Sequence, residues 1–215
     1  SGSDLQSLDD GQTYTIKANV SDIAGNAVEK SIEFSVDTTL PIISSIIPDW
    51  GDELNATEDN SNRNVKVVTS GIEDGQTLTI ELNGKSYTGT IDSNNVTITI
   101  SGSDLQSLDD GQTYTIKANV SDIAGNAVEK SIEFSVDTTS PILTEITAIN
   151  ETTSNINPRY IFNSTKEGKI NSNLPFKSSI NAVKGHNTIT FSELSEGTYE
   201  NKTITVTDSA GNVSN

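Results

Sequence analysis

A stretch of 39 residues occurs twice in this chain without a single difference, as Ser1–Thr39 and Ser101–Thr139. The copies begin 100 residues apart, and each runs into the same step, Asp-Thr-Thr-x-Pro, at Asp37–Pro41 and Asp137–Pro141. A fixed period defines a repeat architecture, and a period of this length is that of a whole domain rather than of a solenoid unit. The sequence therefore predicts a row of domains joined by short Asp-Thr-Thr-x-Pro linkers.

The repeat divides the 215 residues into three parts. Residues 1–38 correspond to the C-terminal half of a repeat, and residues 39–138 form one complete repeat. Residues 139–215 form a divergent domain that we expect to stop before its last strand. Half a sandwich cannot bury its own apolar face, so residues 1–38 need cover, either from the rest of their domain or from strands of another chain.

Alternation of apolar and polar residues predicts β-strands throughout. Leu78, Ile80 and Leu82 alternate with polar neighbours. The same period of two recurs in residues 96–100, 114–120 and 132–136. This period places one face of a strand on a core, and the β-branched residues in these runs favour the same structure. Asn83-Gly84 lies between two such runs and indicates a hairpin turn of type I′.

About seven short strands separated by Gly, Asp and Asn turns are typical of an antiparallel β-sandwich of the immunoglobulin (Ig) type. In the complete repeat we place them at residues 42–47, 65–70, 77–82, 86–91, 96–100, 113–120 and 127–137, with one helical turn at 103–108. In the third part we expect strands at residues 159–163, 187–191 and 202–207. The predicted fold class is all-β, with tandem Ig-like antiparallel sandwiches.

Acidic residues outnumber basic residues by 30 to 13, which gives a formal net charge of −17. The complete repeat alone holds 16 acids and 5 bases. Such a surface repels nucleic acid and anionic lipid, and it suits the binding of a hard divalent cation. The chain has no cysteine and no apolar run long enough to span a membrane, so neither a disulfide nor a membrane insertion is expected.

Residues 50–126 carry a more specific resemblance, which runs from Trp50-Gly-Asp-Glu-Leu to Asp122-Ile-Ala-Gly-Asn126. This run resembles the tandem Ig-like repeats of giant bacterial adhesins, namely the RTX adhesins exported by type I secretion and related biofilm-associated proteins. The third part, with Asp208-Ser-Ala-Gly-Asn212, is similar to another Ig-like module of those proteins. The resemblance implies an extracellular stalk on the bacterial cell surface, stiffened by calcium, that supports adhesion or biofilm formation.

The geometry of an Ig-type sandwich gives a separate reason to expect calcium at the linkers. A linker enters the sandwich at the end where two loops lie, here residues 72–75 and 122–126. An acidic loop of the preceding unit, which contains Asp9 and Asp10, is expected on the other side. Carboxylates so close together repel one another unless a cation lies among them, and Ca²⁺ accepts oxygen ligands in irregular loops.

These considerations give a list of candidate calcium ligands. At the first linker they are Asp9, Asp10, Asp37, Glu73, Asp74 and Asp122, and at the second they are Asp109, Asp110, Asp137, Glu167 and Asp208. The alternative is a set of surface turns without an ion, because Asp and Asn are ordinary turn formers. A further candidate calcium site lies in the loop after Trp50, with Asp52, Glu58 and Asp59 as its ligands, although this loop lacks the EF-hand spacing. Trp50 itself is expected to plug the end of the sandwich rather than to stack on a sugar.

The sequence offers no motif for catalysis. His186 is the only histidine, and no motif places a serine and an acid with it. The acidic pairs Glu73/Asp74 and Asp109/Asp110 fall on tight turns, where they do not flank a cleft as glycosidase carboxylates do. We therefore expect a protein that is not an enzyme.

The repeats favour a structural stalk, because a spacer needs length and no unique pocket. Its partners would be the neighbouring Ig-like domains of the same chain. Two alternatives stay open. In one, the third part is a carbohydrate-binding tip module with a contact patch that includes Leu174, Pro175 and Phe176. In the other, the chain is a subunit of a surface filament in which one copy adds strands to another.

Overall fold

The computed structural model describes residues 2–215, so Ser1, the first residue of the predicted half-domain, lies outside the described part. Packing divides the chain into two compact units. One unit consists of the residues up to Ile47 with Val65–Ile98 and Ile116–Ile132, and the other of Pro48–Asn64, Thr99–Thr115 and Glu133–Asn215. Strands dominate both, which confirms the all-β fold class. Within the described residues, no helix has the length and apolarity needed to cross a membrane.

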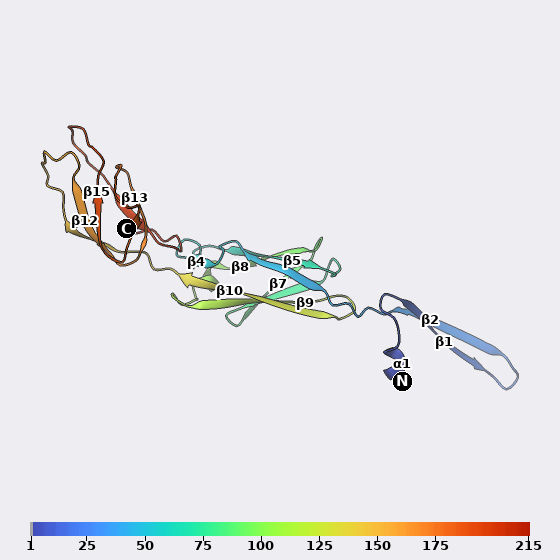
Figure 1. Ribbon diagram of the computed structural model, residues 1–215. Coiled ribbons are helices and arrows are strands. Elements are labelled where there is room, and N and C mark those ends of the chain that lie inside the picture. The colour runs from blue at the N-terminus through green and yellow to red at the C-terminus, as the bar shows by residue number, and fades with distance from the viewer. Residues whose placement is uncertain (1) are drawn as a thin grey trace. The chain divides into compact units, whose positions relative to one another are not determined.

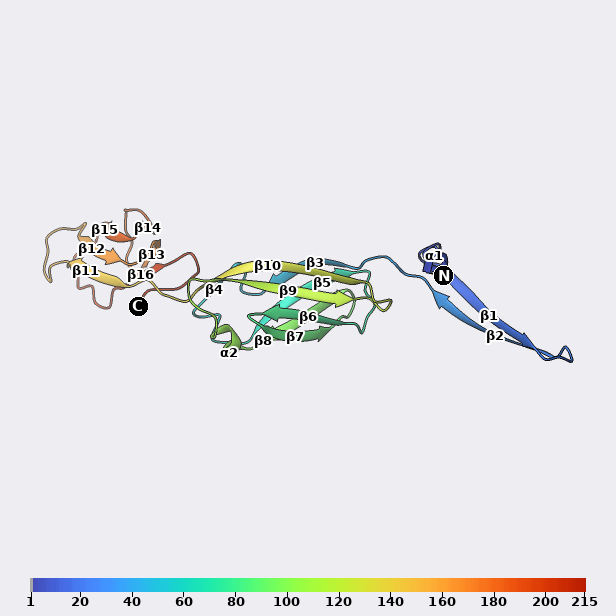
Figure 2. The same cartoon turned by 90° about the horizontal axis from the view of Figure 1, so that it is seen from below.

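The complete repeat forms two sheets, which lie one over the other (Figure 1). Three strands make the smaller sheet, in the order β3 (Ile42–Pro48), β5 (Arg63–Ser70), β8 (Asn95–Ile100). Five strands make the larger sheet, in the order β4 (Glu53–Asn55), β10 (Ala127–Asp137), β9 (Thr113–Ser121), β6 (Thr77–Leu82), β7 (Lys85–Thr90). The order from β10 to β7 can be followed in Figure 2. All seven predicted strands and the predicted turn, α2 (Gly102–Leu105), are therefore confirmed.

The hairpin between β6 and β7 has the predicted turn. Leu82 pairs with Lys85 across it. Asn83 and Gly84 have φ angles of 49° and 75°, the two left-handed residues that a type I′ turn requires. The alternation read from the sequence also holds, because Leu78 and Ile80 are fully buried while their neighbour Glu81 is exposed.

Each unit has its own buried apolar residues. In the first unit they include Ile43, Val65, Val67, Leu78, Ile80, Ile91, Val96, Ile98, Ile116 and Ala118. In the second unit Trp50 is 6% exposed, and its ring centroid lies 5.3 Å from that of Phe134 in an edge-to-face arrangement. Trp50 is thus a core residue, as expected, and presents no face for stacking on a sugar.

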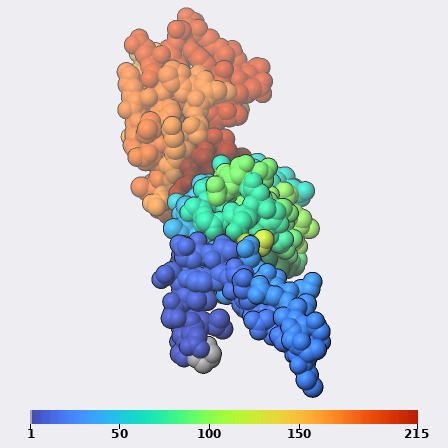
Figure 3. Space-filling model, turned by 90° about the vertical axis from the view of Figure 1, so that its right-hand side faces the viewer, coloured from blue at the N-terminus to red at the C-terminus, as the bar shows by residue number. Residues whose placement is uncertain are grey.

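The first copy of the repeated stretch is a two-stranded hairpin, β1 (Thr13–Ser21) with β2 (Ala27–Ser35), preceded by the single turn α1 (Gly2–Leu5). Its side chains lie at the surface (Figure 3). Ile16 is 56% exposed, whereas the identical residue of the second copy, Ile116, is fully buried. The same sequence therefore forms the same hairpin with and without a second sheet over it.

Residues after the second linker form two three-stranded sheets. One has the order β11 (Leu143–Thr147), β12 (Arg159–Ser164), β15 (Gly185–Thr190), and the other the order β14 (Asn181–Ala182), β13 (Gly168–Ser172), β16 (Ile204–Thr207). The core between them consists of Phe162, Ile170, Ala182, Ile189, Phe191 and Val206. The strands predicted at residues 159–163, 187–191 and 202–207 are confirmed within a few residues, while β11, β13 and β14 were not predicted.

Candidate interdomain sites

A five-residue loop, Asp-x-Ala-Gly-Asn, recurs with one geometry at Asp22–Asn26, Asp122–Asn126 and Asp208–Asn212. In each loop the backbone N–H of the asparagine donates to the aspartate Oδ1 at 2.8 Å. The asparagine side-chain amide also donates to the same carboxylate, at 2.7 to 3.3 Å. The glycine of each loop has a φ of 90° to 95°, which favours glycine because other residues are strained there.

Two of these loops also hold a linker. Asn126 Nδ2 donates to the backbone carbonyl oxygen of Asp37 at 3.1 Å. Asn212 Nδ2 makes the equivalent bond to the carbonyl oxygen of Asp137 at 2.8 Å. We call each linker, together with the residues that contact it and the Asp-x-Ala-Gly-Asn loop that bonds to it, a joint. The first joint consists of Asp37–Pro41 with its contacts, and the second of Asp137–Pro141 with its contacts.

A second carboxylate caps each linker from the preceding turn. Asp10 accepts hydrogen bonds from the backbone N–H and hydroxyl of Thr38 and from the hydroxyl of Thr39, at 2.5, 2.9 and 2.7 Å. Asp110 makes the same three contacts with Thr138 and Thr139, at 2.6, 3.1 and 2.7 Å. Such bonds favour the ionised carboxylate and lower the pKa of both groups, chiefly through the Thr38 N–H for Asp10 and the Thr139 hydroxyl for Asp110.

The neighbouring aspartates have a different role. The hydroxyl of Tyr14 accepts a hydrogen bond from the backbone N–H of Asp9 at 2.8 Å, and Tyr114 accepts one from Asp109 at the same distance. A tyrosine near the start of this strand that bonds back to the preceding turn is a feature of Ig-type sandwiches. Asp9 and Asp109 are thus held through their backbones, and both residues are exposed.

At the first joint the remaining candidate ligands bond to backbone N–H groups. Glu73 Oε2 accepts from Ile123 N at 3.0 Å, so the loop of residues 72–75 is tied to the loop of residues 122–126. Asp37 Oδ1 accepts from Thr39 N at 3.0 Å. Asp74 Oδ1 instead accepts a hydrogen bond from the backbone N–H of Ser93 at 2.7 Å. Burial opposes the ionisation of Asp122, but the hydrogen bonds from Asn126, Gly125 and Ala124 together outweigh it and lower the pKa of Asp122.

The second joint contains a lysine that the sequence prediction missed. Lys166 Nζ lies 2.5 Å from Asp137 Oδ1 and 2.9 Å from Asp208 Oδ2. Burial acts to lower the pKa of Lys166, but the hydrogen bonds and charges of Asp137 and Asp208 more than offset it and raise that pKa. Glu167, the predicted ligand next to it, is exposed.

The second joint is also reached from the long loop that follows Trp50. Asn55 Nδ2 donates to the carbonyl oxygen of Ala210 at 2.8 Å, and the backbone N–H of Ala56 donates to Asn212 Oδ1 at 3.0 Å. A Cβ placed on Gly211 would come within 3.2 Å of Asn55 Nδ2, so the close approach also favours glycine there. This loop therefore contacts the third part of the chain.

The loop after Trp50 does not gather the acids proposed for a further ion. Glu58 Oε2 accepts from the backbone N–H of Asn55 at 3.1 Å, and the backbone carbonyl of Asp52 accepts from Ser135 N at 2.9 Å. Burial raises the pKa of Asp59. Across residues 2–215, no three side chains of the His, Cys, Asp or Glu type form a group suited to a metal ion.

The two joints differ in the charged groups that they would offer to a calcium ion. Around the first linker, Asp37, Glu73 and Asp122 carry carboxylate oxygens, the ligand type that Ca²⁺ prefers, but these three side chains do not form a metal-binding group within residues 2–215. At the second, the ammonium of Lys166 lies between Asp137 and Asp208, and a cation of like charge does not fit beside it. The prediction of calcium at the second linker therefore does not fit these residues.

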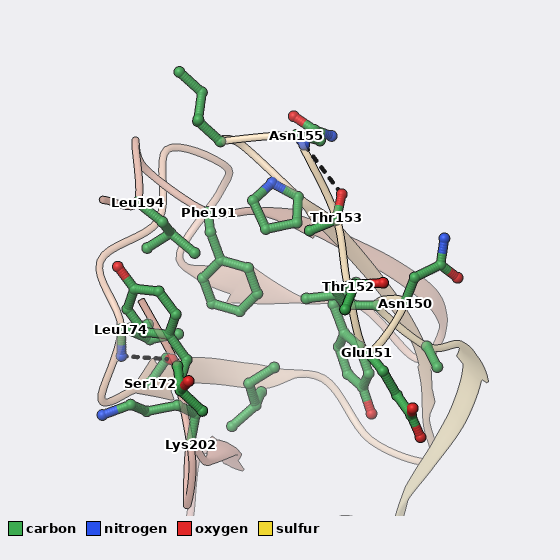
Figure 4. Close-up of a pocket in the computed structure, with 18 of the residues that line it drawn as sticks. Asn150, Glu151, Thr152, Thr153, Asn155, Ser172, Leu174, Phe191, Leu194 and Lys202 are labelled. Carbon is green, nitrogen blue, oxygen red and sulfur yellow. Dashed lines mark hydrogen bonds between the residues drawn. The ribbon is translucent and has the colours of Figure 1, made fainter. Parts of the chain in front are cut away.

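A cleft of about 1210 Å³ opens in the third part of the chain (Figure 4). Leu174, Phe191 and Leu194 line its apolar side, while Asn150, Thr152, Thr153, Asn155 and Lys202 stand around it. Leu174 belongs to the contact patch expected from the sequence, whereas Phe176 packs against the core of this part. Tyr199 also lines the cleft and is 40% exposed.

Comparison with known proteins is most informative for the repeated stretch. Residues 5–40 and 105–144 match the sequence model of the bacterial Ig-like domain (group 3). The repeated stretch is therefore similar in sequence to bacterial Ig-like domains. The Ig-like match spans the Tyr14 and Tyr114 contacts, the Asp-x-Ala-Gly-Asn loops at Asp22 and Asp122, and the linkers that follow them. No curated protein matches the chain in sequence.

Several solved structures are similar to this chain. A calcium-stabilised adhesin with which an Antarctic bacterium binds ice is 22% identical, with a TM-score of 0.44 over 94% of this chain and 54% of that one. The tetra-tandem repeat from the extending region of a large adhesion protein is 21% identical, with a TM-score of 0.41 over 97% and 55%. An Ig-like domain of the M. primoryensis ice-binding adhesin is 29% identical, with a TM-score of 0.33 over 44% of this chain and 98% of that one. The chain thus spans about half the length of the first of these structures.

Proposed function

We propose that this chain is a spacer segment of a bacterial cell-surface adhesin, an extracellular stalk that carries a binding region away from the cell and supports adhesion or biofilm formation. It acts by holding consecutive Ig-like domains together and not by catalysis. The relatives are large bacterial adhesins, one of them an extending region, and this agrees with a spacer role. The neighbouring Ig-like domains of the same chain are its partners.

The observation that carries this proposal is the pair of asparagine bonds to the linkers. Asn126 and Asn212 lie in loops of one sequence and one geometry, and each side chain donates to the carbonyl of the aspartate that begins a linker. Asp10 and Asp110 hold the two threonines of each linker from the preceding turn. The first three residues of such a linker are held from two directions, by the turn before the linker and by the Asp-x-Ala-Gly-Asn loop that follows it in the chain. A spacer that must keep its form requires such contacts.

Calcium belongs to this proposal at the first joint. Asp37, Glu73 and Asp122 would supply carboxylate oxygens to the ion, and binding would have to draw them together, because the three do not form a metal-binding group within residues 2–215. Glu73 is already bonded to the loop that Asp122 begins, and Asn126 joins that loop to the backbone of Asp37. Extracellular calcium modules bind with dissociation constants of roughly 10⁻⁴ to 10⁻³ M, which limits the gain from one ion to a few kcal/mol. Calcium would therefore stiffen this joint more than it would stabilise a whole domain.

Small-angle X-ray scattering of the chain in calcium and in excess EDTA tests the calcium part. We expect a longer and less flexible particle in calcium, and no such change in the Asp122→Asn variant. Identical scattering curves in the two buffers would rule out calcium at the first joint. The spacer role is tested separately with an antibody against residues 39–138, which should label intact cells of the source bacterium without permeabilisation. Labelling only after permeabilisation would contradict a cell-surface stalk.

The cleft in the third part favours a second candidate, a carbohydrate-binding module. Its apolar side and its polar rim, with Asn150, Asn155 and Lys202, are the combination that ligand pockets commonly show. A glycan array probed with the whole chain tests it. Binding that is lost in Leu174→Asp and retained in a variant of exposed Lys169 would place a ligand in the cleft. If no glycan on the array is bound, the carbohydrate-binding role is rejected and the spacer role is the one that remains.

A further inference from the structure

The second joint has a cation of its own. Asp137 ends β10, Asp208 begins the Asp-x-Ala-Gly-Asn loop after β16, and Lys166 lies in the turn between β12 and β13. These three segments are far apart in sequence. Their charged groups meet at distances of 2.5 and 2.9 Å; the second lies within the range of charge-assisted N–H···O hydrogen bonds, and the first is shorter still.

Burial makes this lysine necessary for the pair of carboxylates. The side chain of Asp208 is only 4% exposed, while those of Asp137 and Lys166 are 27% and 26% exposed. A carboxylate as buried as Asp208 is costly unless it is paired and hydrogen-bonded. Asn212 supplies hydrogen bonds to both of its oxygens, and Lys166 supplies the opposite charge.

We propose that Lys166 is the built-in cation of the second joint, which therefore closes without a divalent ion. One ammonium between two carboxylates leaves a net charge of −1, so the repulsion that would call for a metal is already relieved. An incoming Ca²⁺ would have to displace a half-buried lysine from both of its partners. The proposal deepens the spacer role, because it makes the stiffness of this joint independent of calcium.

The first joint differs at the corresponding place. Its turn reads Ser70-Gly-Ile72-Glu73, whereas the turn at the second joint reads Ser164-Thr-Lys166-Glu167. The residue before the shared glutamate is thus a buried isoleucine in one and the lysine in the other. The two joints of one chain therefore differ in the residue at this position of the turn, and the inference about the second joint does not depend on calcium at the first.

Distance measurements between two spin labels test the proposal on the full chain. The chain has no cysteine, so Thr97→Cys and Thr188→Cys, at exposed strand positions before and after the second linker, can be labelled without background. With native Lys166 we expect a narrow distance distribution in excess EDTA, unchanged by millimolar calcium. In Lys166→Met we expect the narrow distribution to be lost in EDTA, whereas Lys166→Arg should retain it.

Two further variants make the result specific. Lys169→Met removes the same charge from an exposed position three residues away and should leave the distribution narrow. Asp137→Asn removes the more exposed carboxylate and should broaden it even if Lys166→Met fails to fold, which circular dichroism would reveal. A native distribution that is broad in EDTA and narrows with calcium would overturn the proposal. The proposal would also be overturned if, in EDTA, Asp137→Asn and a folded Lys166→Met both gave label distance distributions as narrow as that of the native chain. Absence of a calcium effect in scattering would count against the first joint only.

Discussion

The side-chain amide of Asn212 lies 2.8 Å from the backbone carbonyl oxygen of Asp137, which is 75 residues earlier in the chain. The same amide donates to both carboxylate oxygens of Asp208, and its oxygen accepts from Ala56 N. One side chain thus joins a linker, its own loop and the loop that follows Trp50. Because Asn212 is only 4% exposed, it cannot exchange these partners for water without opening the joint.

Replacement of this asparagine by alanine should therefore destabilise the third part of the chain. Asn212→Ala removes partners from the buried carboxylate of Asp208 and from a partly buried linker carbonyl, and unpaired buried groups cost about 1–3 kcal/mol each. Asn26→Ala is the matched control, because Asn26 occupies the same loop but is exposed. Urea unfolding of both variants measures the difference. Equal loss of stability in the two would mean that the contact within the loop, and not the linker, is what matters.

Two identical isoleucines offer a second matched pair. Ile116 is fully buried in the complete repeat, and Ile16 is 56% exposed in the first hairpin. Truncation of a buried isoleucine to alanine costs about 2–5 kcal/mol, whereas an exposed change is usually within about 0.5 kcal/mol. Trp50, the only tryptophan, is buried in the same repeat and reports its unfolding by fluorescence. We expect Ile116→Ala to lower the unfolding midpoint and Ile16→Ala to leave it unchanged; equal midpoints would contradict this burial.

The cap on the second linker should depend on acid pH. The hydroxyl of Thr139 is the main cause of the lowered pKa of Asp110, with the N–H of Thr138 next. A group whose folded pKa is depressed adds stability above its unfolded pKa, near 3.8, and loses it as the pH falls through the lower folded value. Carboxyl NMR titration should place the midpoint of Asp110 below 3.8, and Thr139→Val should raise it towards 3.8. If the titration midpoint of Asp110 is the same in the native chain and in Thr139→Val, the Thr139 hydroxyl does not bond to Asp110.

Alkaline pH should open the second joint. The pKa of Lys166 is raised above its ordinary value of 10.5 by Asp137 and Asp208. A cation with a raised folded pKa adds stability that is fully present below the unfolded pKa and is lost as the pH rises through the folded value. The Thr97/Thr188 label distances should thus stay narrow up to about pH 10.5 and broaden above it. Lys166→Arg should resist the change, because the guanidinium stays protonated.

Much of the fold could be predicted from the sequence, because a half-buried strand shows an alternation of apolar and polar residues. The alternation of Leu78, Ile80 and Leu82 decided both the strand and its buried face. By contrast β4 (Glu53–Asn55) has only three residues, of which Leu54 alone is apolar and buried, and it is a strand because it pairs in parallel with β10. That pairing is set by tertiary structure and leaves no local period to read.

The candidate sites were only partly predictable for a related reason. The acids at the linkers are conspicuous, but most of them bond to nearby N–H groups and hydroxyls, as Asp10 does with Thr38 and Thr39. Asn126 and Asn212 could have been found, because the Asp-x-Ala-Gly-Asn loop recurs in the sequence. Lys166 could not have been found in this way, because a single lysine in a polar turn forms no sequence pattern. Its role is evident only from its contacts with Asp137 and Asp208 in the folded chain.

Residual dipolar couplings of the whole chain, measured in excess EDTA, test most directly whether the second joint holds its neighbours together. Amide couplings from β6, β9 and β10 report the complete repeat, and those from β12, β13 and β15 report the domain after the linker. We predict that both sets fit one common alignment tensor, as parts of a single rigid body do, and that Asn212→Ala separates them. Two different tensors for the native chain would contradict a joint that is closed by Asn212 and Lys166.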